Sequence, residues 1–193
     1  MAHQYPINFC PVCAARLERR EKHGAMRPVC PSCNYVHFCD PKVAAITLIE
    51  RNGQVLLARR AMNPAKGRWT LPGGFVECEE DPRETAIREC REELGLEVEI
   101  TRLMDLYYGK AHEGGASIVI LYAGRLEEGT APEPGDDVDA VAFFGPKELP
   151  ELAFASTRQI LAEWRGPSNA VGTVSGEIGL RDRGGEPKRD PTV

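Results

Sequence analysis

The chain of 193 residues has no long hydrophobic run. No stretch approaches the roughly 18 apolar residues that a membrane-spanning helix needs, and the first residues lack the apolar core of a secretory signal. We therefore expect a cytoplasmic protein that does not bind membranes. The length suits one domain of ordinary size with a small appendage, because two full domains would be crowded.

An excess of basic charge is missing as well. Lys and Arg number 24 against 29 Asp and Glu, which gives a formal net charge of -5. Proteins that hold nucleic acid on a broad surface rely on many Lys and Arg contacts to phosphate. The balance argues against a nucleic-acid partner and leaves room only for a local basic patch.

The seven cysteines do not follow a disulfide pattern. Four of them form two C-x-x-C pairs, Cys10-Pro-Val-Cys13 and Cys30-Pro-Ser-Cys33. The other three, Cys39, Cys78 and Cys90, are scattered singly. In a reducing compartment this usage favours metal binding over disulfide bonds.

Two C-x-x-C turns supply four thiolates, the set that suits tetrahedral Zn²⁺ in a closed structural site. A segment of about 35 residues has too little core to fold on apolar burial alone, so the metal should supply most of its folding free energy. We predict a zinc ribbon over residues 1–40 with Cys10, Cys13, Cys30 and Cys33 as ligands. His37 and Cys39 are weaker candidates and stay outside the set.

A middle region, residues 41–165, alternates strand-like and helix-like patterns and is predicted as a single α/β (α+β) domain. Strands are expected at 43–50 and 54–60, joined by Asn52-Gly53, a pair that accepts positive φ in a tight hairpin. Periodicity predicts the remaining strands at 97–108, 117–124 and 140–144, and helices at 82–94 and 156–164. The last segment, 166–193, has no apolar period and is expected to be a flexible tail.

Helix 82–94 has clear boundary signals. Asp81 can be the N-cap, Pro82 fits the first helical position, Glu84 can complete a capping box, and Gly95 can end the helix. On a helical wheel one arc is apolar and should pack on the sheet. Its members are Ala86, Ile87, Cys90 and Leu94.

Three glutamates, Glu89, Glu92 and Glu93, share another arc and are predicted to form one anionic surface. Like charges at this spacing repel by a few tenths of a kcal/mol per pair, and a divalent cation would compensate. Carboxylate oxygens suit Mg²⁺ or Mn²⁺, and Mg²⁺ commonly binds together with substrate phosphates. The alternative is a solvated helix face paired with Arg88 and Arg91.

The residues before the helix favour the metal hypothesis. Gly73 and Gly74 give a backbone that can approach a ligand closely. Glu80 adds a fourth acid, and Arg88 can hold carboxylates in place.

Residues 74–96 match, at every fixed position, the Nudix box, G-x5-E-x7-R-E-U-x-E-E-x-G-U, where U is apolar. The fixed positions are Gly74, Glu80, Arg88, Glu89, Glu92, Glu93 and Gly95, with Cys90 and Leu96 as the apolar residues. The chain is therefore identified as resembling the Nudix hydrolases. The resemblance implies an α/β/α sandwich with a mixed sheet behind the zinc ribbon.

The resemblance also implies an activity. Family members use divalent metals to hydrolyse nucleoside diphosphates linked to another moiety, which makes Glu89, Glu92, Glu93 and often Glu80 the metal ligands. Arg88, Glu92 and Glu93 become the catalytic residues, with Gly73 and Gly74 at the bound group. The general base is either Glu93 or one member of an acidic loop, Asp136, Asp137 and Asp139, which otherwise reads as a solvated turn.

The substrate is less sharply defined. A zinc ribbon before a Nudix box resembles the NADH pyrophosphatases, but their SQPWPFPxS segment is absent, and no proline follows Gly95 until Pro132. The segments FCPVC, CPSC, GRWTLPGGFVE and LAFASTRQIL are most similar to zinc-ribbon Nudix enzymes related to plant plastid FAD pyrophosphatases, which also accept ADP-ribose. The resemblance implies FAD or ADP-ribose as a substrate that yields AMP and a phosphorylated product.

Three other functions stay open: an NADH pyrophosphatase, a hydrolase of oxidised nucleotides, and a regulator that senses a nucleotide through this fold. Fold-level analogy adds the expectation of a homodimer. Four aromatic residues could stack on adenine or flavin, although such residues at strand ends are more often core. They are Trp69, Phe75, Tyr107 and Tyr108.

Overall fold

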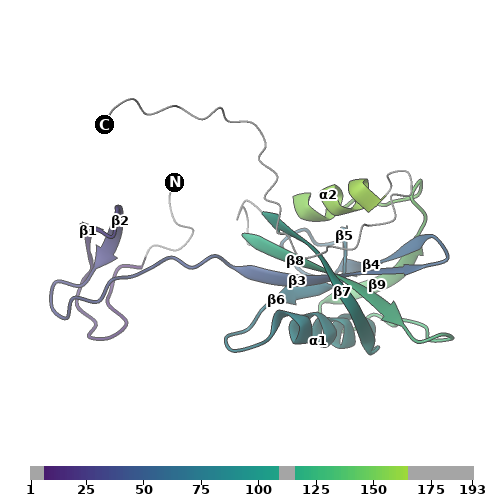
Figure 1. Cartoon of the computed structure of the whole chain (residues 1–193), viewed down its shortest axis with the longest axis horizontal. Helices are drawn as coiled ribbons and strands as arrows, with labels where there is room; N and C mark the ends of the chain where they lie inside the picture. The colour runs from purple at the N-terminus through teal and green to yellow at the C-terminus, as the bar shows by residue number, and fades with distance from the viewer. Residues whose placement is uncertain (1–6, 109–115, 165–193) are drawn as a thin grey trace, which may run out of the picture.

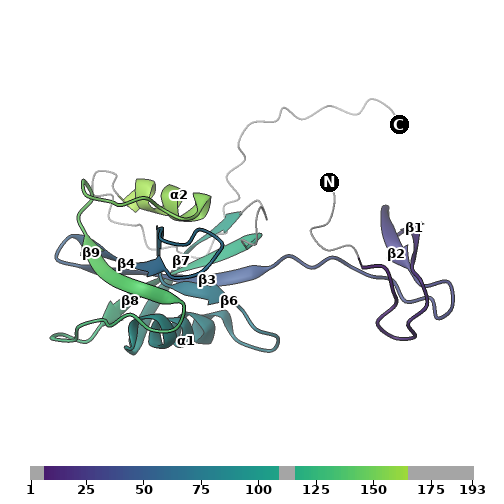
Figure 2. The same ribbon diagram turned by 180° about the vertical axis from the view of Figure 1, so that it is seen from behind.

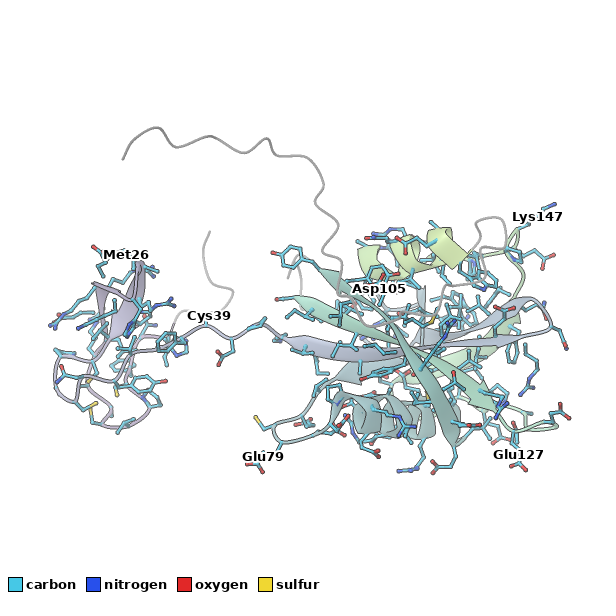
Figure 3. All side chains as sticks on the ribbon, in the orientation of Figure 1. Met26, Cys39, Glu79, Asp105, Glu127 and Lys147 are labelled. Carbon is cyan, nitrogen blue, oxygen red and sulfur yellow. The ribbon has the colours of Figure 1, made fainter. Side chains whose placement is uncertain are left out.

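The computed structural model describes residues 7–108 and 116–164. The tail predicted at 166–193 lies outside the described residues. Two sheets are present in the described part: a hairpin of β1 (Glu18–Lys22) and β2 (Ala25–Val29), and a seven-stranded sheet. Figure 1 shows the hairpin apart from the large sheet, and Figure 3 shows Cys39 on the extended segment that connects them.

The large sheet has the order β5-β4-β3-β8-β7, with β6 paired to β3 and β9 paired to β4. Its strands are β3 (Val43–Arg51), β4 (Gln54–Arg60), β5 (Trp69–Thr70), β6 (Gly73–Phe75), β7 (Val98–Tyr108), β8 (Ile118–Leu126) and β9 (Val138–Phe144). Strands β3 and β8 run parallel, whereas the other pairs are antiparallel. The predicted mixed sheet is confirmed.

Helices α1 (Pro82–Leu94) and α2 (Ala155–Trp164) lie on opposite faces of this sheet, as the two views in Figures 1 and 2 show. Strand β3 is buried on both faces, so it reads as a nearly continuous apolar run. Ala45 and Ile49 belong to the core under α1, while Ile46 and Leu48 belong to the core under α2. The α/β/α sandwich follows from this double burial.

Helix α1 has the predicted boundaries. Asp81 accepts a hydrogen bond from the Arg83 backbone N–H at 2.8 Å, and Gly95 ends the helix with a φ of 66°. The expected capping-box bond, in which the Asp81 N–H would donate to the Glu84 carboxylate, is not formed among the described residues. The apolar stripe is confirmed, because Ala86, Cys90 and Leu94 are fully buried and Ile87 packs against them.

The Asn52-Gly53 hairpin is confirmed, with φ values of 53° and 73° at the two residues. Strands β1, β2, β5 and β6 were not predicted, because two to five residues are too few to show a period. No helix in the described part of the chain has the length and apolar character needed to cross a membrane.

Candidate active site and zinc centre

The turn into β6 brings the backbone against α1. A Cβ on Gly73, whose φ is 140°, would lie 2.3 Å from the Ala45 carbonyl oxygen. A Cβ on Gly74 would lie 2.3 Å from Glu89 Oε1. Gly73 therefore needs glycine, because the clash is with backbone atoms at a positive φ, whereas at Gly74 the clash is with the movable end of the Glu89 side chain. The Gly73 N–H donates to Glu93 Oε2 at 3.0 Å.

Arg88 lies between three of the predicted acids. Its Nε donates to Glu80 Oε1 at 2.8 Å, and its Nη1 donates to Glu89 at 2.8 Å and to Glu92 at 2.9 Å. Its Nη2 reaches the Phe75 carbonyl oxygen at 3.2 Å. The guanidinium lowers the pKa of Glu80 to about 2, with the Thr85 hydroxyl adding to the effect.

Glu93 stands apart from this network and is only 3% exposed. Burial raises the pKa of Glu93 to about 8, and burial also raises the pKa of Glu89. The prediction of one anionic surface was therefore wrong for Glu93. The helical wheel places it beside Glu89 and Glu92 but does not include the β6 backbone that covers it.

The glutamates fit a hard divalent cation by donor type, since Glu89, Glu92 and Glu93 each keep one oxygen outside the hydrogen bonds just described. Their ligand atoms are not gathered to the same degree as the cysteine sulfurs. Within 7–108 and 116–164, the four cysteines are the one group of three or more acids, histidines or thiols placed to hold a metal ion, with ligand atoms within 4.8 Å of one another. The glutamate ligand set stays a prediction.

The acidic loop contributes one member to this region. Asp137 lies 3.7 Å from Arg60, and its charge helps to raise the pKa values of Glu89 and Glu93. Asp139 instead pairs with Arg59 at 2.6 Å. The Gly135 N–H donates to the Glu93 carbonyl oxygen at 3.1 Å, so the loop is anchored to the end of α1.

A pocket of about 620 Å³ adjoins Gly73 and Gly74 on the α2 side. Of the four aromatic candidates, Phe75 and Tyr108 line it. Trp69 instead packs edge-on against Phe144 at 4.8 Å between ring centroids, and the Tyr107 hydroxyl donates to Glu163 at 2.7 Å. The pocket also exposes three arginines that the sequence patterns missed: Arg60, Arg68 and Arg158.

The four cysteine sulfurs lie 3.4–3.6 Å apart in the pairs Cys10–Cys33, Cys13–Cys30 and Cys13–Cys33. Sulfurs at about 2.3 Å from a tetrahedral zinc are about 3.8 Å from each other, so the cluster fits Zn²⁺. His37 and Cys39 are not members.

The two C-x-x-C turns, Cys10–Cys13 and Cys30–Cys33, have the same backbone conformation. Ala14 and Asn34 both have positive φ, 59° and 61°, and their N–H groups donate to the carbonyl oxygens of Cys10 and Cys30. The Cys33 N–H also donates to the Cys30 sulfur, and this bond is the main cause that lowers the pKa of Cys30 to about 6. Each turn therefore presents its thiols to a common point.

The family model described as the NUDIX domain matches residues 40–164. The chain belongs to the Nudix family. It is a Nudix pyrophosphohydrolase, and enzymes of this family generally use divalent metals.

Named relatives agree with the Nudix assignment. The ADP-ribose pyrophosphatase of Methanocaldococcus jannaschii is 36% identical over 120 residues, which cover 62% of this chain and 71% of that protein. The NAD-capped RNA hydrolase NudC of Vibrio parahaemolyticus is 26% identical over 152 residues, which cover 78% of this chain but 56% of that protein. A solved NUDIX hydrolase from Nitrosomonas europaea is 32% identical, with a TM-score of 0.74 and coverage of 82% of this chain and 90% of that one.

Proposed function

We propose that this Nudix enzyme hydrolyses ADP-ribose or FAD at the pyrophosphate and releases AMP with a phosphorylated product. The observation that carries the proposal is the 620 Å³ pocket, which adjoins the Gly73–Gly74 turn and is lined by the half-exposed ring of Phe75. Its volume is in the range of nucleotide-sized ligands, and its mixture of apolar and arginine side chains suits a base and phosphates. The similarity to an ADP-ribose pyrophosphatase supports the choice.

Four glutamates and one arginine would form the metal site. Glu80, Glu89, Glu92 and Glu93 would hold Mg²⁺ or Mn²⁺, which when bound neutralises the pyrophosphate and acidifies the attacking water. Arg88 fixes the carboxylates of Glu89 and Glu92 in relation to Glu80.

Glu93 is the preferred general base. Its Oε2 accepts from the Gly73 N–H, so its Oε1 can take the proton of the attacking water; in that role Oε1 does not bind the metal, and Glu80, Glu89 and Glu92 would hold the ion. Asp137 is the alternative base, because it lies in the loop that is anchored to α1 and influences the same carboxylates.

The cysteine cluster would hold a structural Zn²⁺ in the ribbon, with residues 1–40 as the ribbon and 41–165 as the catalytic domain. The likeness to a NudC protein favours one second candidate, an activity on NAD derivatives such as NADH. Hydrolysis of oxidised nucleotides, a sensing role without turnover, a homodimer and a cytoplasmic location stay predictions.

The test is to incubate purified protein with Mg²⁺ or Mn²⁺ and FAD, ADP-ribose, NADH or 8-oxo-dGTP, and to resolve the products by chromatography. A Glu92→Gln variant removes a proposed metal ligand. Glu84→Gln, an exposed acid in the first turn of the same helix, is the matched control. Formation of AMP from FAD or ADP-ribose, lost in Glu92→Gln and kept in Glu84→Gln, is expected; no turnover of any compound with either metal would favour the sensing role.

A further inference from the structure

The charged side chains that line the pocket are all of one sign. Among the described residues 7–108 and 116–164 they are Arg60, Arg68 and Arg158, and no aspartate or glutamate of these ranges lines the pocket, although the chain as a whole has a net charge of -5. Arg60 is linked to the glutamate site, because it pairs with Asp137 and its charge acts to lower the pKa of Glu93. Arg68 and Arg158 have no such link to the glutamates.

Arg68 and Arg158 are held beside the same short segment. Arg68 Nη2 lies 2.9 Å from Glu151 Oε1, and Arg158 Nη1 donates to the Leu152 carbonyl oxygen at 3.0 Å. Backbone bonds between Trp69 and residues 151 and 153 keep that segment next to β5. The two guanidinium groups therefore approach the pocket from neighbouring positions.

A buried contact fixes this arrangement. Thr70 and Thr157 share a hydrogen bond of 3.1 Å between their hydroxyl oxygens, which joins β5 to the first turn of α2. Thr157 is adjacent to Arg158, and Thr70 is two residues from Arg68, so the bond fixes the backbone near both arginines, which line the same pocket.

Neither guanidinium of the pair is held by a strong ionic partner, so a phosphate can compete for it. Glu151 has a side chain that is 73% exposed, and exposed ion pairs of this kind contribute little. Arg158 bonds to a neutral carbonyl and keeps its full charge. A guanidinium has a planar set of N–H donors that matches the oxygens of a phosphate, and its charge strengthens each bond.

We propose that Arg68 and Arg158 form a subsite for a second phosphate of the substrate, separate from the diphosphate that is cleaved beside α1. A nucleoside diphosphate derivative whose pocket-bound half carries an additional phosphate on its ribose should then bind more tightly than ADP-ribose or FAD, which share the same cleaved diphosphate. The inference rests on the proposed function, because it assigns the substrate class of the same pocket.

The experiment measures dissociation constants by calorimetry on the full chain, using matched ligands that differ by one phosphate. The pairs are 5′-AMP with adenosine 2′,5′- or 3′,5′-bisphosphate, and ribose 5-phosphate with ribose 1,5-bisphosphate. We expect the bisphosphate of at least one pair to bind about tenfold more tightly or better. Arg158→Gln and Arg68→Gln should remove that gain, and Arg158→Lys should keep part of it.

Arg125→Gln is the control. Arg125 is an exposed residue of β8 that pairs with Glu99 of β7 and does not line the pocket. Equal binding within every pair, or a gain that survives both glutamine variants, would overturn the inference. An equal loss for both members would assign the arginines to the common phosphate and overturn it too. Turnover of FAD or ADP-ribose is measured separately, so the proposed function can hold while the second-phosphate subsite fails.

Discussion

The two candidate metal centres are built in opposite ways. In the ribbon, four sulfurs already lie within 4.8 Å of one another, placed by two backbone turns of the same geometry. Beside α1, Arg88 holds Glu80, Glu89 and Glu92, while Glu93 is buried under Gly73. Four gathered thiolates suit a closed structural site that the chain completes alone, whereas carboxylates held by one guanidinium suit a proposed site that would also use substrate phosphates.

The largest expected effect is the loss of a zinc thiolate. Cys30→Ser should unfold the ribbon, because the hairpin of β1 and β2 has few buried side chains, and structural zinc contributes on the order of 10 kcal/mol. Hydrogen exchange should show amides at 18–29 losing their protection while those of α1 keep theirs. Cys39→Ser, which changes an exposed cysteine outside the cluster, should leave the exchange pattern unaltered. Protected ribbon amides in Cys30→Ser would show that the ribbon does not depend on metal.

The glutamate centre should respond in activity and not in folding. Glu93→Gln keeps the shape and the bond from Gly73 but cannot take a proton, so kcat should fall by about 10²–10⁴. The melting temperature near pH 7 should change little, because a pKa of about 8 keeps most of the buried Glu93 uncharged, as glutamine is. Glu97→Gln, an exposed acid paired with Arg91, is the control for both readouts. Near-normal kcat in Glu93→Gln would move the general base to Asp137.

The pH dependence of stability distinguishes two residues of the glutamate centre, Glu93 and Glu80. The pKa of Glu93 is about 8 in the folded chain and 4.5 for the free group, so the folded state binds more protons between these values. The free energy of unfolding without divalent metal should therefore fall as the pH rises from 4.5 to about 8, by about 5 kcal/mol at most. Glu80 has the opposite sign, because its pKa is lowered to about 2 and its contribution is lost as the pH falls from 4.5. Urea titrations at several pH values measure the slope, which should be reduced in Glu93→Gln; an equal slope in that variant would assign it to other groups.

The features that sequence patterns predicted are those encoded locally. The ends of α1 follow from Asp81, Pro82 and Gly95, and the cysteine cluster follows from the two C-x-x-C spacings. The burial of Glu93 could not be predicted, because it depends on a three-residue strand that shows no period of its own.

The placement of Arg68 and Arg158 at one pocket could not be predicted from sequence patterns either. Arg68 precedes β5 and Arg158 lies in α2, and both line the same pocket because the segment at 151–153 packs along β5. Long-range pairing of this kind leaves no signal in a window of neighbouring residues.

The smallest predicted effect tests how tightly the backbone fits the glutamates. In Gly74→Ala the new methyl group would lie 2.3 Å from Glu89 Oε1, but that atom ends a flexible side chain and can move. Folding should change little, whereas Glu89 would be pushed away from Arg88 and Mg²⁺ affinity should fall about tenfold, as is typical when the residues that orient a ligand are altered. Isothermal titration with Mg²⁺ measures this, and Gly145→Ala, where the nearest atom is 3.4 Å away, serves as the control. Unchanged Mg²⁺ affinity in Gly74→Ala would mean that the turn does not set the position of Glu89. The glutamate side chains would then tolerate a displaced backbone contact, in contrast to the cysteine turns, where backbone conformation places the thiols.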